Sequence, residues 1–255
     1  MKVVCAQTDI VWEDKAANFA HVRALLDKAE MVPGSLIVLP EMFATGFSMN
    51  SKATVDNGET CAFLVDLAKR HRSSVMGGLV ERGRVKAGRN TLLAVDAHGK
   101  ILSRYCKMFP FRLGGERDAH DLGEEVVTFT LEVMTVAPFI CYDLRFPEIF
   151  RTASAKGAEL MVVIANWPSK RVDHWVTLLR ARAIENLTYV IGVNRSGKDP
   201  FHEYPGRTLI IDPHGRIMAD AGANESVITA DIDPEVVRNW RKEFPALRDR
   251  RDIES

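Results

Sequence analysis

Hydrophobic residues along the chain alternate between short apolar runs and longer stretches with helical spacing. The short runs are rich in β-branched side chains, which predicts buried strands, and the helical spacing predicts helices that pack one face on a sheet. Strands are expected at residues 2–7, 36–39, 74–80, 90–96, 101–106, 133–140, 160–164, 189–194, 206–211 and 227–231. Helices are expected at residues 15–30, 59–72, 149–156 and 174–186. This alternation predicts an α/β fold.

Three chemically active side chains come directly after predicted strands. They are Glu41, Lys107 and Cys141. Open α/β sheets place reacting groups at strand ends, where the turn exposes a side chain and the strand holds its backbone. Each residue also has a structural interpretation, as a packed core cysteine, a salt-bridged glutamate or a surface lysine. Three such coincidences are hard to explain by core packing and indicate a catalytic set.

These residue types suit acyl transfer through a thioester. Cysteine attacks as the thiolate, and a positive neighbour such as Lys107 would lower the pKa of the Cys141 thiol. Glu41 would take the thiol proton and later pass a proton to the leaving amine. The Lys107 ammonium and the backbone N–H of Tyr142 would stabilise the oxyanion that forms when the thiol adds to a carbonyl.

Composition narrows the class of protein. The chain has 255 residues, 46% of them hydrophobic and 27% charged, which predicts one domain spanning residues 1–255. The formal net charge is zero, so no basic field attracts nucleic acid or an anionic membrane. The sequence shows no signal peptide and no apolar stretch of transmembrane length, which favours the cytoplasm. Four scattered cysteines without metal-type spacing indicate neither disulfides nor a metal.

The catalytic candidates lie in motifs that resemble a known family. The nitrilase superfamily of carbon–nitrogen hydrolases has a Glu-Lys-Cys triad, and its motifs are similar to Leu-Pro-Glu at residues 39–41, to Lys107 with its aromatic loop, and to Cys-Tyr-Asp-Leu-Arg-Phe-Pro-Glu at residues 141–148. Residues 40–49, 164–168 and 174–186 look most similar to the bacterial omega-amidase branch, which hydrolyses side-chain amides of 2-oxo acids.

The resemblance implies an α-β-β-α sandwich, a small amide substrate, no cofactor and a homodimer. It also places the family's second glutamate, which positions the lysine and the substrate, at Glu116 in the polar, glycine-rich stretch 111–122. The candidate substrate-binding residues are Phe111, Arg112, Tyr142, Arg145, Asn166 and Trp167. Arg112 or Arg145 would hold a substrate carboxylate, unless the first is a solvated loop charge or the second a structural ion-pair member. Trp167 lines the pocket or simply packs in the core.

Other interpretations remain open. Another nitrilase-family amidase or a carbamoylase would use the same three residues on a different small amide. A Cys-His hydrolase would instead use His120 or His174 as the base, although neither follows a predicted strand. A non-catalytic binding protein on the same fold would be expected to have lost part of the triad, and all three residues are present.

Overall fold

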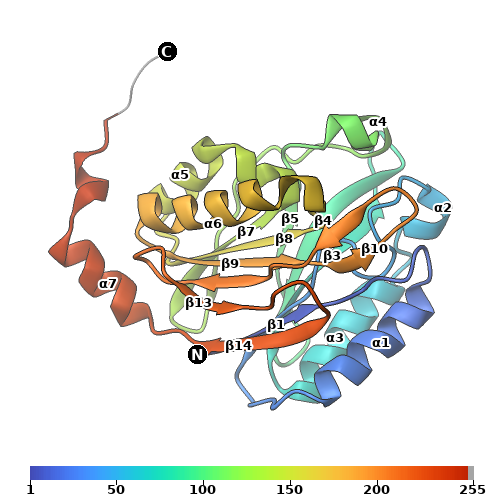
Figure 1. The fold of residues 1–255 in the computed structure, drawn as a ribbon, viewed down its shortest axis with the longest axis horizontal. Helices are drawn as coiled ribbons and strands as arrows, with labels where there is room; N and C mark the ends of the chain where they lie inside the picture. Colours follow the sequence, from blue (N-terminus) through green and yellow to red (C-terminus); the bar gives the residue numbers. More distant parts are fainter. Residues whose placement is uncertain (252–255) are drawn as a thin grey trace.

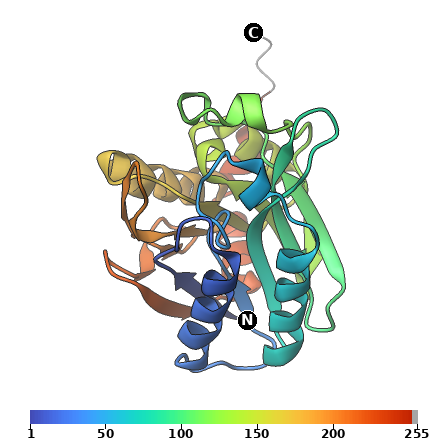
Figure 2. The same cartoon turned by 90° about the vertical axis from the view of Figure 1, so that its right-hand side faces the viewer.

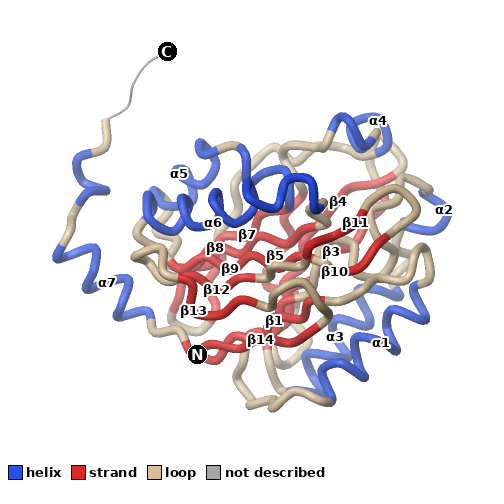
Figure 3. The backbone as a smooth tube through the Cα atoms, in the orientation of Figure 1, coloured by secondary structure: helices blue, strands red, loops and turns tan. Residues whose placement is uncertain are grey.

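The computed structural model describes residues 1–251. Two six-stranded sheets pack face to face, and helices cover the outer face of each (Figure 1). Figure 3 shows the strands as a central double layer, with α5 and α6 on one side and α1 and α3 on the other. The expected α-β-β-α sandwich is confirmed.

The first sheet has the strand order β14-β1-β2-β3-β4-β5 and the second has the order β13-β12-β9-β8-β7-β6. The strands of the first sheet are β1 (Lys2–Gln7), β2 (Leu36–Val38), β3 (Ser74–Arg82), β4 (Gly88–Val95), β5 (Ile101–Cys106) and β14 (Ser226–Asp231). Those of the second are β6 (Phe129–Leu131), β7 (Met134–Ile140), β8 (Leu160–Ala165), β9 (Tyr189–Asn194), β12 (Leu209–Ile211) and β13 (Ile217–Asp220). A separate hairpin pairs β10 (Ser196–Lys198) with β11 (Glu203–Pro205).

The main helices are α1 (Lys15–Asp27), α3 (Glu59–His71), α5 (Pro147–Ala155), α6 (Val172–Asn186) and α7 (Pro234–Glu243). Figure 2 shows α1 and α3 side by side on the first sheet. Their apolar faces, with Leu26, Leu64 and Leu67 fully buried, close one layer of core. A larger cluster fills the space between the sheets and beneath α5 and α6, so four layers enclose two cores.

Strand direction explains why the reactive residues converge. β1, β2 and β3 are parallel, and β5 runs in the same direction as β3 because both are antiparallel to β4. In the second sheet, β7, β8 and β9 are parallel to one another. The carboxyl ends of β2, β5, β7 and β8 therefore present the residues that follow them at one edge of the double layer.

Several parts of the chain differ from the prediction, and among them are the unpredicted short strands β6, β10, β11 and β13. The stretch 111–122 contains a short helix, α4 (Glu116–Ala119), preceded by a 3-10 turn. Helix α7 was not predicted, although Asp233 as its N-cap and Pro234 in its first turn are ordinary start signals. Helix 15–30 ends earlier, at Asp27. None of the helices formed by residues 1–251 is both long enough and apolar enough to cross a membrane.

Candidate active site

Cys141 lies at a sharp elbow where β7 ends and a 3-10 turn begins. Its backbone has a φ of 49°, in the left-handed region, which costs a non-glycine residue about 1–3 kcal/mol and persists only when the surroundings enforce it. The residue is 8% exposed, and its sulfur lies 3.9 Å from the carbonyl oxygen of Asn166. The thiol is therefore aimed by a strained backbone toward the end of β8.

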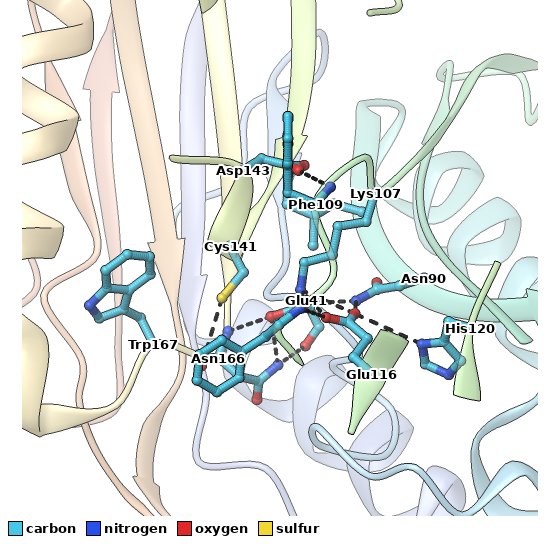
Figure 4. A network of polar contacts seen from close by, with 12 residues as sticks. Glu41, Asn90, Lys107, Phe109, Glu116, His120, Cys141, Asp143, Asn166 and Trp167 are labelled. Atoms are coloured by element: carbon cyan, nitrogen blue, oxygen red, sulfur yellow. Dashed lines mark hydrogen bonds and ion pairs between the residues drawn. The ribbon is translucent and has the colours of Figure 1, made fainter. Parts of the chain in front are cut away.

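Lys107 follows β5 and lies between two buried carboxylates (Figure 4). Its Nζ is 3.0 Å from Glu41 Oε1 and 2.8 Å from Glu116 Oε2. The lysine is 2% exposed and both glutamates are fully buried. Glu41, Lys107 and Glu116 thus form one buried cluster of charges.

Asn90 connects the two carboxylates. Its Nδ2 donates to Glu41 Oε1 and to Glu116 Oε1, both at 2.7 Å. Glu116 also accepts from the backbone N–H of Phe111, and the Nδ1 of His120 lies 3.8 Å from its Oε1. His120 is therefore a direct neighbour of the Glu116 carboxylate.

The pKa values follow from this pairing. Burial by itself lowers the pKa of Lys107, but the charges of Glu116 and Glu41 outweigh it and raise the pKa well above its ordinary value. Burial by itself raises the pKa of Glu116, but Lys107, His120 and Asn90 outweigh it and lower the pKa to about 2. The ammonium and the Glu116 carboxylate therefore stay charged at neutral pH.

The Cys141 thiol has a pKa well above its ordinary value. Burial is the largest cause, the negative charge of Glu41 adds to it, and Lys107 opposes both. Lys107 thus acts in the direction expected from the sequence, but its effect is smaller than the other two together. The resting thiol is protonated at neutral pH, so its proton must be removed by a base during the reaction.

Glu41 also lies at a tight elbow, because Met42 has a φ of 44°. The elbow packs directly on Gly78 of β3. A Cβ at Gly78 would lie 2.6 Å from Met42 N and 2.7 Å from Glu41 Cα, closer than atoms can approach. Gly78 is therefore the residue that lets the backbone of Glu41 come this close to the sheet.

Asn166 fixes Glu41 from the other sheet. Its backbone N–H donates to Glu41 Oε2 at 2.8 Å, and its side-chain Nδ2 donates to the Glu41 carbonyl at 2.7 Å. The sequence analysis expected this amide to bind the substrate, and Asn166 does line the cavity described next. Its nitrogen, however, is committed to Glu41, which leaves its Oδ1 facing no protein partner within residues 1–251.

A cavity of about 620 Å³ opens above Cys141. Aromatic side chains line much of its wall, namely Trp12, Phe47, Phe111, Tyr142, Trp167, Phe201 and Tyr204. Two carboxylates also reach it, but both are occupied by neighbours. Glu13 accepts from Ser48 and Asn50, and Asp199 accepts from the hydroxyl of Tyr204.

Two arginines face this cavity and one expected arginine does not. Arg145 and Arg171 line it, whereas Arg112 is exposed on the 3-10 turn and lies outside it. Arg145 packs over the ring of Trp167, with 4.8 Å to the centroid, and Arg171 packs over Phe111 at 5.4 Å. Neither guanidinium forms a salt bridge with any carboxylate of residues 1–251.

The positive charges of the two guanidiniums repel each other. Burial lowers the pKa of Arg145, and the positive charge of Arg171 lowers it further. Arg145 also contacts His174, whose Nδ1 lies 3.2 Å from its Nη2. An anion bound between the arginines would relieve this repulsion.

Sequence reasoning missed several residues of the site. The sequence pattern places Asn90 only in a strand, and it singles out neither Arg171 nor Asp143. A polar residue at the start of an otherwise apolar strand was an available signal for Asn90. Within residues 1–251, no group of three or more His, Cys, Asp or Glu side chains is arranged to hold a metal ion.

The residues expected from the resemblance to the nitrilase superfamily thus meet in one place, with Glu41, Lys107 and Cys141 after strands of the sandwich and Glu116 at the start of α4. The sequence model of the carbon–nitrogen hydrolase family matches residues 2–242, and the chain belongs to this family. The family predicted from the three motifs is confirmed, and the protein is accordingly an enzyme that hydrolyses carbon–nitrogen bonds.

Individual relatives cover almost the whole chain. A 2-oxoglutaramate amidase of Bacillus subtilis is 34% identical over 98% of this chain and 98% of its own length. The omega-amidase YafV of Yersinia enterocolitica is 37% identical over 98% of this chain and 96% of its own. Among solved structures, XC1258 of Xanthomonas campestris, a CN-hydrolase superfamily protein, has a TM-score of 0.93 and 32% identity, covering 100% of this chain and 98% of that one.

Proposed function

We propose that this protein is an omega-amidase, which hydrolyses the terminal amide of a small 2-oxo dicarboxylic acid monoamide to the acid and ammonia. The observation that carries the proposal is one cavity that combines a thiol beside a buried glutamate–lysine cluster with two arginines that have no acidic partner among residues 1–251. The names of the two similar relatives, omega-amidase and 2-oxoglutaramate amidase, support the same substrate class.

Glu41 acts as the general base in this proposal. The Cys141 thiol is protonated at rest, so attack on the amide carbonyl requires that its proton pass to a nearby carboxylate. Glu41 is held by Lys107, Asn90 and the backbone N–H of Asn166, which fixes its orientation. It later returns a proton to the leaving nitrogen, so that ammonia departs and a thioester remains.

Lys107 stabilises the oxyanion. An ammonium has three N–H donors, and Lys107 Nζ lies 3.0 Å from Glu41 Oε1 and 3.1 and 2.8 Å from the two oxygens of Glu116. One donor shared between the two Glu116 oxygens frees the third for the developing negative charge. The backbone N–H of Tyr142 is the second donor. Water, activated by Glu41, then attacks the thioester and releases the acid product. Glu116 keeps the lysine charged and in place through both steps.

Arg145 and Arg171 receive the substrate's carboxylate. A carboxylate that enters an aromatic-lined cavity loses its hydration, and charged donors are needed to offset this cost. Both guanidiniums reach the cavity that contains Cys141, whereas Arg112 lies outside it. Arg171 therefore takes the role that the sequence analysis offered to Arg112.

Ammonia release tests the proposal directly. Wild-type protein is given 2-oxoglutaramate, an uncharged amide of equal length and an N-carbamoyl amino acid, with Cys141→Ala as the inactive control. The proposal expects the oxo-acid amide to have by far the highest kcat/KM. If the carbamoyl compound is preferred, the chain is a carbamoylase, and if Cys141→Ala keeps activity, the thioester mechanism fails. Activity that is lost in His120→Ala or His174→Ala alone would favour a Cys-His hydrolase.

We also infer that two chains pair as a homodimer. Ile184 on α6 is 49% exposed and lies against the turn at Gly215, while Trp240 on α7 contacts His214 and stacks on Phe244, itself 50% exposed. These contacts form an apolar surface patch across three elements, which a second copy would cover. Light scattering after size exclusion should give twice the chain mass, and Phe244→Asp should shift it toward the monomer.

A further inference from the structure

We propose that Asp143 is a positioning residue, which holds the backbone around Lys107 and around Cys141 in one fixed arrangement. The inference rests on the proposed function, since it assumes that these two residues act together on the substrate. Asp143 is fully buried, and both of its carboxylate oxygens are bonded to other parts of the chain, so it acts through these neighbours.

The Asp143 carboxylate grips the chain on both sides of the lysine. Its Oδ2 accepts from the Tyr105 hydroxyl at 2.8 Å. Its Oδ1 accepts from the backbone N–H of Phe109 at 2.9 Å (Figure 4). Tyr105 lies two residues before Lys107, and Phe109 lies two residues after it. The segment that carries the ammonium is thus held at both ends by one side chain.

The same carboxylate holds the elbow of the cysteine. Its Oδ2 also accepts from the backbone N–H of Ile140, the last residue of β7, at 2.9 Å. Cys141, the next residue, has the left-handed φ of 49°. This conformation persists only where surrounding contacts enforce it, and the bond from Asp143 back to Ile140 closes the turn around it.

Packing alone does not explain a charge at this position. Asp143 is fully buried, and burial raises its pKa to about 7 although Ile140, Lys107, Tyr105 and Phe109 all lower it. An apolar side chain of similar size would avoid this cost. A carboxylate is the side chain that can accept three hydrogen bonds from the ends of two strands in different sheets.

Asp143→Asn tests the role with little change in shape. An amide presents one oxygen and one NH2 group, so either Phe109 or Ile140 loses its acceptor whichever way the amide turns. We expect kcat to fall about 10²-fold at a nearly unchanged KM, the size of effect that a small misplacement of reacting groups produces. The rate at which iodoacetamide modifies Cys141, followed by peptide mass mapping, should fall as well.

A matched control separates positioning from general loss of stability. Leu67 is a fully buried residue of α3 in the core on the far side of the first sheet, and Leu67→Ala should lower the Tm while leaving kcat and the alkylation rate of Cys141 unchanged. If Asp143→Asn behaves like this control, with a lower Tm and wild-type kcat and alkylation, the proposal is overturned.

Tyr105→Phe is the second variant. It removes one of the three hydrogen bonds and keeps both backbone bonds, so kcat and the alkylation rate should fall by less than in Asp143→Asn, again at unchanged KM. Should Asp143→Asn fail to fold, this variant decides, and wild-type values for both rates would reject the proposal. A fully active Cys141→Ala would instead reject the proposed function, so the two failures are distinguishable.

Discussion

The buried charge cluster beside Cys141, here called the floor, and the arginine pair that lines the cavity, here called the mouth, use charge in opposite ways. At the floor, the charges of Glu41, Lys107 and Glu116 are buried and paired with one another. At the mouth, Arg145 and Arg171 both line the cavity, and neither forms a salt bridge with a carboxylate of residues 1–251. The charges of the floor are thus already paired before a substrate binds, and we call the floor complete. The arginines of the mouth have no such partner within residues 1–251, and we call the mouth incomplete.

This difference separates two tasks. A complete floor holds donors and base in a fixed geometry, so they need not reorganise when charge develops in the transition state. An incomplete mouth gains most when the ligand supplies the missing negative charge, so it selects among amides rather than reacting with them. Floor variants should therefore slow all amides alike, and mouth variants should slow the charged ones.

The largest effect is expected from Glu41→Gln. Losing a positioned general base should lower kcat by about 10²–10⁴-fold, for 2-oxoglutaramate and for the uncharged amide equally. Glu116 still pairs with Lys107 in this variant, so the fold and the Tm should be nearly kept. Steady-state ammonia release measures kcat for both substrates. A near-wild-type kcat would remove Glu41 from the mechanism, and a loss confined to the charged substrate would erase the contrast between floor and mouth.

A smaller and selective effect is expected at the mouth. Arg145→Ala and Arg171→Ala should each lower kcat/KM for 2-oxoglutaramate. The fall should correspond to a loss of roughly 1.5–3 kcal/mol of transition-state stabilisation, the usual contribution of a charged hydrogen bond. The uncharged amide should be affected much less. Arg112→Ala is the matched control, because it removes an exposed arginine outside the cavity and should leave both substrates unchanged.

The three arginine variants also show which arginine binds the substrate carboxylate. If Arg112→Ala is selective and the other two variants are not, the substrate carboxylate lies elsewhere than the cavity geometry suggests. If all three treat charged and neutral amides alike, the chain is an amidase with another acyl preference.

The sequence predicted the floor far better than the mouth. Glu41 and Cys141 each come after an apolar run that ends abruptly, and Lys107 follows a third predicted strand, residues 101–106, so the sequence pattern marks all three as strand-end residues. Arg171 lies in a 3-10 turn with no periodicity, and Arg112 in a similar turn points out of the cavity, so no pattern could distinguish them. Asn90 and Asp143 act through the pairing of distant strands, which one sequence does not encode locally.

Gly78→Ala should disturb the floor through packing. The added Cβ would meet the backbone of Met42 and Glu41, which cannot yield as a side chain can, so Glu41 must shift and kcat should fall for both amides. The stability loss should be about 1–3 kcal/mol, as for other overpacked sites. Gly77→Ala is the control, because its Cβ would meet the flexible ends of Leu64 and Phe43. Equal kcat values in the two variants would show that the elbow of Glu41 is not sensitive to this contact.

The smallest expected effect concerns Glu116, which should make the free energy of unfolding depend on pH. Its folded-state pKa is lowered to about 2 from the ordinary 4.5, chiefly because the pairing with Lys107 outweighs burial. Its contribution to stability is therefore fully present above about pH 4.5 and is lost as pH falls toward 2, by at most about 1.4 kcal/mol per pH unit for one group. Denaturant unfolding below pH 4.5 should show a shallower slope in Glu116→Gln than in wild type. Glu124→Gln, which removes an exposed carboxylate, should keep the wild-type slope. If Glu116→Gln also keeps the wild-type slope, the pairing with Lys107 does not lower the pKa of Glu116. The floor would then be no more complete than the mouth.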